Sequence, residues 1–249
     1  MQYLPSMCLI TLAYRSHPRY TLVLAANRDE FLDRPTDPAH FWKDAPHILA
    51  GRDRKAGGTW LGVTRTGRFA ALTNHRDLHR PANPGPSRGL LVRKALDGDL
   101  AGEDTSRYEG FNLLHGMVDD LHYHNNVQPH SIPLSPGIHG LSNAFLNTPW
   151  PKVERATAML HGLMETEGDE LVEGLFTLLA HDRPAPDERL PETGLPTDME
   201  RAVSSIFINA PGYGTRCSTV VLMEKDGSIR FEERTRGQED PVSERFHLG

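Results

Sequence analysis

A cysteine, Cys8, directly follows Met7 and opens an apolar, strand-like run that continues through Leu12. A cysteine at the N-terminus of a chain carries a nucleophile, the thiol, and a base, the α-amine, on one residue. The reference pKa of an α-amine is about 7.7–8.0, which suits proton transfer near neutral pH. The spacing therefore predicts acyl-transfer chemistry at Cys8, on the condition that Cys8 becomes the first residue.

Seven residues precede Cys8 in this sequence, so three alternatives are open. Met7 is the true start, and removal of the initiator methionine exposes Cys8; or residues 1–7 are an extension that is cut off during maturation; or the protein does no such chemistry. The third alternative has a plain basis, because a cysteine in an apolar strand is ordinarily a small buried hydrophobe.

Polar residues gather where other apolar runs are expected to end, and such positions can converge on one rim of a sheet. Side-chain amides there can donate hydrogen bonds to an oxyanion, an arginine can hold a thiolate or a substrate carboxylate, and a carboxylate can orient an α-ammonium. The residues that fit these roles are the amides of Asn74 and Asn143, the guanidinium of Arg216 and the carboxylates of Asp29 and Glu30.

Each of these residues also has a structural interpretation. Asparagine at a strand end is commonly a turn former. The run Arg28-Asp29-Glu30 can be a solvated group of ion pairs that contributes little energy. Both interpretations remain open from the sequence.

The composition limits the class of protein. A formal net charge of −6 argues against general nucleic-acid binding, and no apolar run approaches the length of a membrane span. Two cysteines give neither a disulfide framework nor a zinc-binding spacing, so we expect a cytoplasmic protein. No convincing linker interrupts residues 1–249, which predicts a single domain with residues 1–7 as an extension or a mis-assigned start. The oligomeric state does not follow from the sequence.

The thirteen histidines raise the alternative of a metal or haem site. His122 and His124 would share one face of a strand, but no third ligand stands at a recognised spacing. We therefore expect no metal site, and no cofactor is required by the pattern.

The elements that must position these residues are mainly strands. Two runs, 8–14 and 20–26, are apolar at nearly every residue, which predicts a hairpin in a sheet that is covered on both faces. A second hairpin is expected around Thr66-Gly67-Arg68, and the proline-bearing segment 33–46 is expected to be a surface loop. Further strands are expected at 111–117, 120–125, 204–209, 218–224 and 228–234.

Two amphipathic helices are expected at residues 151–167 and 169–180. Apolar residues recur there at helical spacing, among them Val153, Ala156 and Leu160 in the first segment and Leu171 and Leu175 in the second. Strands, then helices, then strands predict an α+β layered domain.

Four segments in order resemble one known family. They are LVLAANRDEF, GGTWLGVTRTGRFAALTNHR, HGLSNAFLNTPWPKV and YGTRCSTVVL, and together they are similar to the NRDE family, which is named for Asn27-Arg28-Asp29-Glu30. Its eukaryotic members are called transport and Golgi organisation proteins. The resemblance spans nearly the whole chain and implies kinship with the N-terminal nucleophile (Ntn) hydrolases, with a four-layer αββα sandwich of two antiparallel sheets flanked by helices.

The resemblance also implies a site. In the bile-salt hydrolase and penicillin V acylase group of these hydrolases, matching positions correspond to Cys8, Asn74, Asn143 and Arg216, and more loosely to Arg28 and Asp29. Expected substrate-contacting residues are Asn27, Glu30, Trp60 and Thr73.

Two functions from different classes follow from the resemblance. The first is a cysteine amidohydrolase that acts on a small or lipid-like linear amide or acyl substrate. The alternative is a non-catalytic protein that binds and traffics haem, acyl-CoA or lipid, because eukaryotic members of the family are linked to secretory organisation, lipid and acyl-CoA metabolism and haem handling.

Overall fold

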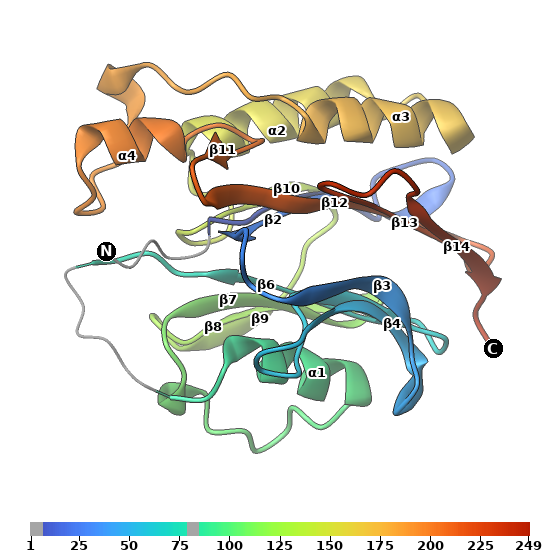
Figure 1. Ribbon diagram of the computed structural model, residues 1–249. Helices are drawn as coiled ribbons and strands as arrows, with labels where there is room; N and C mark the ends of the chain where they lie inside the picture. The colour runs from blue at the N-terminus through green and yellow to red at the C-terminus, as the bar shows by residue number, and fades with distance from the viewer. Residues whose placement is uncertain (1–6, 79–84) are drawn as a thin grey trace.

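The computed structural model describes residues 7–78 and 85–249 of the chain, and these residues form two antiparallel sheets that lie face to face (Figure 1). The first sheet has the strand order β10 (Gly137–Leu141), β1 (Leu9–Tyr14), β2 (Tyr20–Phe31), β12 (Tyr213–Glu224), β13 (Ser228–Thr235) and β14 (Val242–His247), with β11 (Asn209–Ala210) paired to β12. The second sheet has the order β3 (Thr36–Trp42), β4 (Ala45–Asp53), β5 (Leu61–Thr64), β6 (Arg68–Asn74), β7 (Phe111–Met117), β8 (Asp120–Asn125) and β9 (His130–Pro133).

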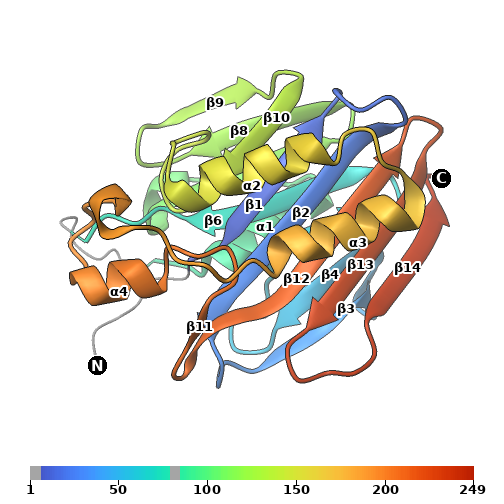
Figure 2. The ribbon, with the colours of Figure 1, turned by 90° about the horizontal axis from the view of Figure 1, so that it is seen from above.

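Helices cover the outer face of each sheet (Figures 1 and 2). Helices α2 (Pro151–Gly162) and α3 (Gly168–Leu179) pack on the first sheet, and α1 (Arg88–Asp97) packs on the second. A short helix, α4 (Thr197–Ala202), and two 3₁₀ turns, Thr105–Arg107 and Asp187–Arg189, lie in the connections. The predicted four-layer αββα architecture is therefore confirmed.

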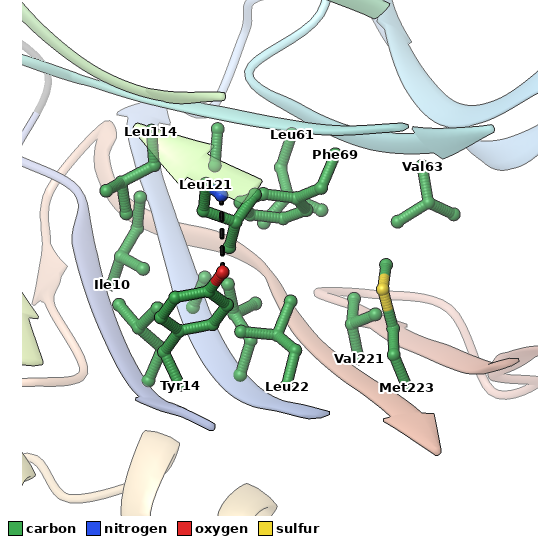
Figure 3. Packing of buried hydrophobic residues seen from close by; sticks show 14 of the residues in the cluster. Ile10, Tyr14, Leu22, Leu61, Val63, Phe69, Leu114, Leu121, Val221 and Met223 are labelled. Atoms are coloured by element: carbon green, nitrogen blue, oxygen red, sulfur yellow. Dashed lines mark hydrogen bonds between the residues drawn. The ribbon is translucent and has the colours of Figure 1, made fainter. Parts of the chain in front are cut away.

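The largest hydrophobic cluster lies between the two sheets (Figure 3). Ile10, Leu12 and Tyr14 of β1 point into it, and the Tyr14 hydroxyl accepts a hydrogen bond from the backbone N–H of Leu121 in the facing sheet at 3.3 Å. Leu9 and Ala13, which alternate with them, pack instead under the helices. Because both faces of β1 are buried, the strand must be apolar at nearly every residue, as the sequence predicted.

The two expected helices and the turn at Gly67 are confirmed, although the first helix ends at Gly162 rather than at residue 167. Gly67 has a φ of 84°, a left-handed conformation that suits glycine in a tight turn. Within the region 204–209, which was predicted to be a strand, only Asn209 is in one, so that prediction is wrong. In this irregular segment Ile206 packs under the helices, and its carbonyl oxygen accepts a hydrogen bond from the Asn27 side chain.

The predicted surface loop at 33–46 is also wrong, because β3 and the start of β4 occupy most of it. Pro38 is tolerated because β3 is an edge strand and its pairing with β4 shifts register between Asp37 and His40. A proline in a sheet is found at such edges and bulges, where no ladder hydrogen bond is lost. Two further edge strands, β9 and β14, escaped the sequence analysis.

Candidate functional site

Cys8 lies immediately before β1, where the register of the first sheet determines its neighbours. Leu9, the first residue of β1, pairs with Asn27. Continuing this antiparallel register by one and two residues sets Cys8 across from Arg28 and Met7 across from Asp29. Cys8 is 6% exposed, and its Sγ lies 4.0 Å from the backbone oxygen of Asp29. Its own carbonyl oxygen accepts a hydrogen bond from the hydroxyl of Ser142 at 2.9 Å.

A buried carboxyl group and a buried ammonium group lie beside the Met7–Cys8 peptide bond. Asp29 is fully buried, and the hydroxyl of Thr215 donates to its Oδ1 at 2.6 Å. Lys152 is 3% exposed, and its Nζ donates to the carbonyl oxygen of Met7 at 2.7 Å. Burial raises the pKa of Asp29, although Lys152 and Thr215 oppose that rise, and burial lowers the pKa of Lys152.

The two predicted asparagines meet on the other side of Cys8. Asn143 follows β10, and its Nδ2 donates to the backbone oxygen of Asn74, the last residue of β6, at 3.0 Å. The hydroxyl of Ser142 reaches Asn143 Oδ1 at 3.1 Å as well as the Cys8 carbonyl. Asn74 at the end of β6 and Asn143 after β10 are far apart in the sequence, and the fold brings them together near the start of β1. The sequence analysis expected polar residues at strand ends to converge in this way.

Arg28 and Arg216 line a small open hollow on the face of the first sheet that looks toward the second. The guanidinium of Arg28 stacks on the ring of Trp60 at 4.1 Å and donates to the Thr36 hydroxyl at 2.9 Å. Arg216 Nη1 donates to the backbone oxygen of Leu32 at 2.6 Å. Two cations, an aromatic ring and the acidic side chains of Asp37 and Glu233 therefore line this hollow. The carboxylate of Glu30 lies 3.9 Å from Arg28.

The tetrapeptide 27–30 lies inside β2 and not beyond its end, so its residues alternate between the two faces of the sheet. Asn27, Arg28 and Asp29 are at most 5% exposed, which contradicts the alternative of a solvated ion-pair group. Asn27 points to the helix side, where its Nδ2 donates to the carbonyls of Leu179 and Ile206.

Two residues expected to contact substrate are bonded within the scaffold. The Oδ1 of Asn27 accepts a hydrogen bond from Ser218, and Asn27 does not line the hollow. Thr73 is fully buried, donates to the carbonyl of Ser142 and accepts a hydrogen bond from Asn112. Trp60 lines the hollow, and Glu30 lies beside Arg28.

The second cysteine, Cys217, is in the same row of side chains but cannot pair with Cys8. Arg28 of β2 stands opposite Cys217 of β12, so the two cysteines are separated by an intervening strand. Two strand spacings are about 9–10 Å, beyond the roughly 7 Å that a disulfide spans between Cα atoms. Burial and the neighbouring carboxyl of Glu233 raise the pKa of Cys217, which makes its thiol a poor nucleophile.

Sequence analysis missed Lys152 and Arg76 as parts of this region. Lys152 had a detectable signal, because it stands four residues before Ala156 on the apolar face of a predicted amphipathic helix. A charged residue at such a position needs a buried partner. Arg76 carried no comparable signal, and its burial against Glu200, at 3.0 Å, comes from the tertiary fold.

No group of three or more His, Cys, Asp or Glu side chains able to hold a metal occurs in the described ranges 7–78 and 85–249. In the same ranges, no helix has the length and apolar character that crossing a bilayer requires.

Comparisons with known proteins show one matching family and several proteins of similar sequence or structure. The sequence model of the family Transport and Golgi organisation 2 matches residues 7–238. A Transport and Golgi organization protein 2 homolog of Bos taurus is 34% identical over 270 residues, which cover 95% of each protein.

Two solved structures are similar at low sequence identity. A Caenorhabditis elegans N-acylethanolamine-hydrolyzing acid amidase ortholog has a TM-score of 0.47 at 9% identity, covering 86% of this chain and 92% of that one. A mutant conjugated bile acid hydrolase from Clostridium perfringens has a TM-score of 0.48 at 7% identity, covering 95% of this chain and 92% of that one.

Proposed function

The chain belongs to the Transport and Golgi organisation 2 family, and from that premise and the surroundings of Cys8 we propose that it is an amidohydrolase with Cys8 as its N-terminal nucleophile. Its substrate class is a small or lipid-like molecule with a linear amide or related acyl bond. The observation that carries the proposal is the position of the buried Cys8 thiol, 4.0 Å from the backbone oxygen of Asp29, where Ser142 joins the Cys8 carbonyl to Asn143 and Asn143 contacts Asn74.

The reaction needs the α-amine of Cys8 as its base, so residue 7 must be removed first. The neutral amine takes the thiol proton as Sγ attacks the substrate carbonyl, and a tetrahedral oxyanion forms. The side-chain amides of Asn143 and Asn74 supply donors for that oxyanion. Return of the proton to the leaving amine breaks the C–N bond and leaves a thioester on Cys8, which water hydrolyses to release the acid.

Asp29 and the arginines have separate roles in this proposal. Met7 stands opposite Asp29 in the register, so a new α-ammonium at residue 8 would lie near that carboxyl group. Arg28 follows Asn27, the partner of Leu9 in the sheet, and with Arg216 it would provide positive potential that favours the thiolate over the thiol. Asp29 is therefore a positioning residue, and the arginines act through charge.

The test is turnover of N-acyl aminocoumarins with acyl chains of different length by a protein that begins at Cys8. Such a protein is made by cleaving a fusion partner directly before residue 8. We expect release of fluorescent aminocoumarin by this protein, none by its Cys8→Ala variant, and full activity in a Cys217→Ala control. An unchanged rate in Cys8→Ala would show that the proposal is wrong.

A binding function remains the alternative, and the two arginines of the hollow favour one version of it. Arg28, Arg216 and Trp60 would hold an anionic group such as the phosphates of an acyl-CoA. Haem fits poorly, because no histidine lines the hollow. Stoichiometric acyl-CoA binding without turnover, lost in Arg28→Met, would support this alternative; a haem titration without a Soret shift would exclude the haem version.

We also propose a cytoplasmic location. Neither cysteine is in a disulfide, and both thiols are buried, as suits a reducing compartment.

A further inference from the structure

Met7, the residue directly before the proposed nucleophile, is completely enclosed. It is 0% exposed and packs in an apolar cluster with Val203, Ile208 and Tyr213. These partners come from the end of α4 and from the region of β11 and β12, which lie at the same end of the molecule (Figures 1 and 2). Removal of Met7 would therefore vacate an apolar space beside Cys8.

Three groups of Met7 have specific partners in this space. The backbone N–H donates to the Tyr213 hydroxyl at 2.8 Å, and the carbonyl oxygen accepts from Lys152 Nζ at 2.7 Å. The sulfur lies 3.3 Å from Nη1 of Arg76. Backbone donor, backbone acceptor and side chain are thus each recognised, as in the binding of an amino-acid-like ligand.

Two buried cations are more than a methionine residue requires. Lys152 and Arg76 are each at most 5% exposed, and burying an ammonium group to serve a neutral carbonyl costs more than burying a neutral donor. Asp29 and Glu200 compensate the two cations, and burial raises the pKa of Asp29, so its carboxyl can become neutral when another anion enters. This arrangement suits an occupant that carries a carboxylate or develops negative charge on oxygen.

We propose, resting on the function proposed above, that Val203, Ile208, Tyr213, Lys152 and Arg76 form a substrate pocket, the Met7 pocket, which Met7 fills until the chain is cut before Cys8. The pocket takes an unbranched apolar group of about the size of a methionine side chain. Its neighbouring carbonyl or carboxylate oxygen lies on Lys152, and an adjacent amide N–H donates to Tyr213. The substrate class is accordingly an N-acylated amino acid or an amide of similar shape.

The test is calorimetric titration with N-acetyl-L-methionine, which offers all three groups, and with N-acetylglycine, which lacks the side chain. The protein that begins at Cys8 should bind N-acetyl-L-methionine at least tenfold more tightly than N-acetylglycine. The protein that begins at Met1 should bind neither, because Met7 occupies the pocket. Equal affinity for the two ligands, or equal binding by the two proteins, would overturn the inference.

Variants identify the pocket residues. Lys152→Met should lose at least tenfold in affinity for N-acetyl-L-methionine, whereas Lys94→Met, which changes a lysine on α1, should bind normally. Tyr213→Phe provides a milder change, since it removes only the hydroxyl acceptor, and should weaken binding by about fivefold. Unchanged affinity in Tyr213→Phe and Lys152→Met would contradict the assignment.

The outcome is independent of the hydrolase test. Binding does not require the thiol, so Cys8→Ala in the protein that begins at residue 8 should still bind N-acetyl-L-methionine. Amide hydrolysis without this binding would refute the Met7 pocket alone. Binding without hydrolysis would refute the hydrolase and leave the pocket in place.

Discussion

Replacing Lys152 with Met removes the cation that faces the buried carboxyl group of Asp29. The change loses a charged hydrogen bond to the Met7 carbonyl, worth about 2 kcal/mol. Asp29 can take up a proton at small cost, because burial already raises its pKa. We expect Lys152→Met to lower the free energy of unfolding by about 2 kcal/mol.

The reciprocal change, Asp29→Asn, leaves Lys152 as a buried ammonium without its carboxylate. Breaking a buried pair from one side costs about 3–5 kcal/mol, and we expect the lower end because the pKa of Lys152 is lowered and the group can lose its proton. The double variant buries neither charge, so it should be destabilised by about 3 kcal/mol rather than by the sum of about 5. The expected coupling is therefore about 2 kcal/mol.

The assay is urea unfolding of the four proteins at pH 7, with the exposed pair Arg201 and Asp187 as a matched control cycle. The control cycle should be additive within error, because both side chains are solvated. Additivity within about 0.5 kcal/mol for Asp29 and Lys152 would refute the claim that they act as one buried pair.

Three further predictions concern other parts of the fold. Burial and two neighbouring histidines lower the pKa of His115 to about 4. Its pKa in the folded protein is thus below its pKa in the unfolded chain, so the folded state has its full stability above about pH 6.5 and loses stability as the pH falls toward 4. In urea unfolding at pH 7 and 4.5, the stability lost between the two pH values should be about 2 kcal/mol smaller in His115→Gln than in the unmodified protein. An equal loss in both proteins would contradict this prediction. Gly51→Ala would place a Cβ 2.1 Å from the ring of Trp60 and should lower the free energy of unfolding by about 2 kcal/mol. The control Gly162→Ala, whose Cβ would have no atom within 4 Å, should leave it unchanged. Equal thermal midpoints of the two variants would disprove this account. Asn27→Ala leaves two carbonyls and a hydroxyl without their partner and should cost about 3 kcal/mol by urea unfolding; a loss below 0.5 kcal/mol would show that Asn27 is not structural.

The sequence was sufficient for the layered fold because its strongest patterns are unambiguous. Strands β1 and β2 are apolar on both faces since one side meets a sheet and the other meets helices. It was insufficient for β3, because Pro38 is a strong signal against a strand unless the register shift beside it is known. Edge strands such as β14, whose burial alternates between half-buried and exposed residues, also give weak patterns.

For the site, the sequence indicated which strand ends converge but not the direction of each side chain. The tetrapeptide 27–30 looked like a surface turn, yet the pairing of β2 with β12 continues as far as Phe31 and buries it. Which of Arg28 and Asp29 faces the hollow depends on register, and a shift of one residue would exchange them. The contact between Lys152 and Met7 joins residues 145 positions apart, so no local pattern could predict it.

The central claim is that Cys8 works as the first residue of the chain. The most direct measurement is the intact mass of the protein purified from its own host, read together with the mass of its N-terminal peptide. The account predicts a chain that begins at Cys8, with the Met7 pocket vacated. A mature protein that retains Met7 would contradict it.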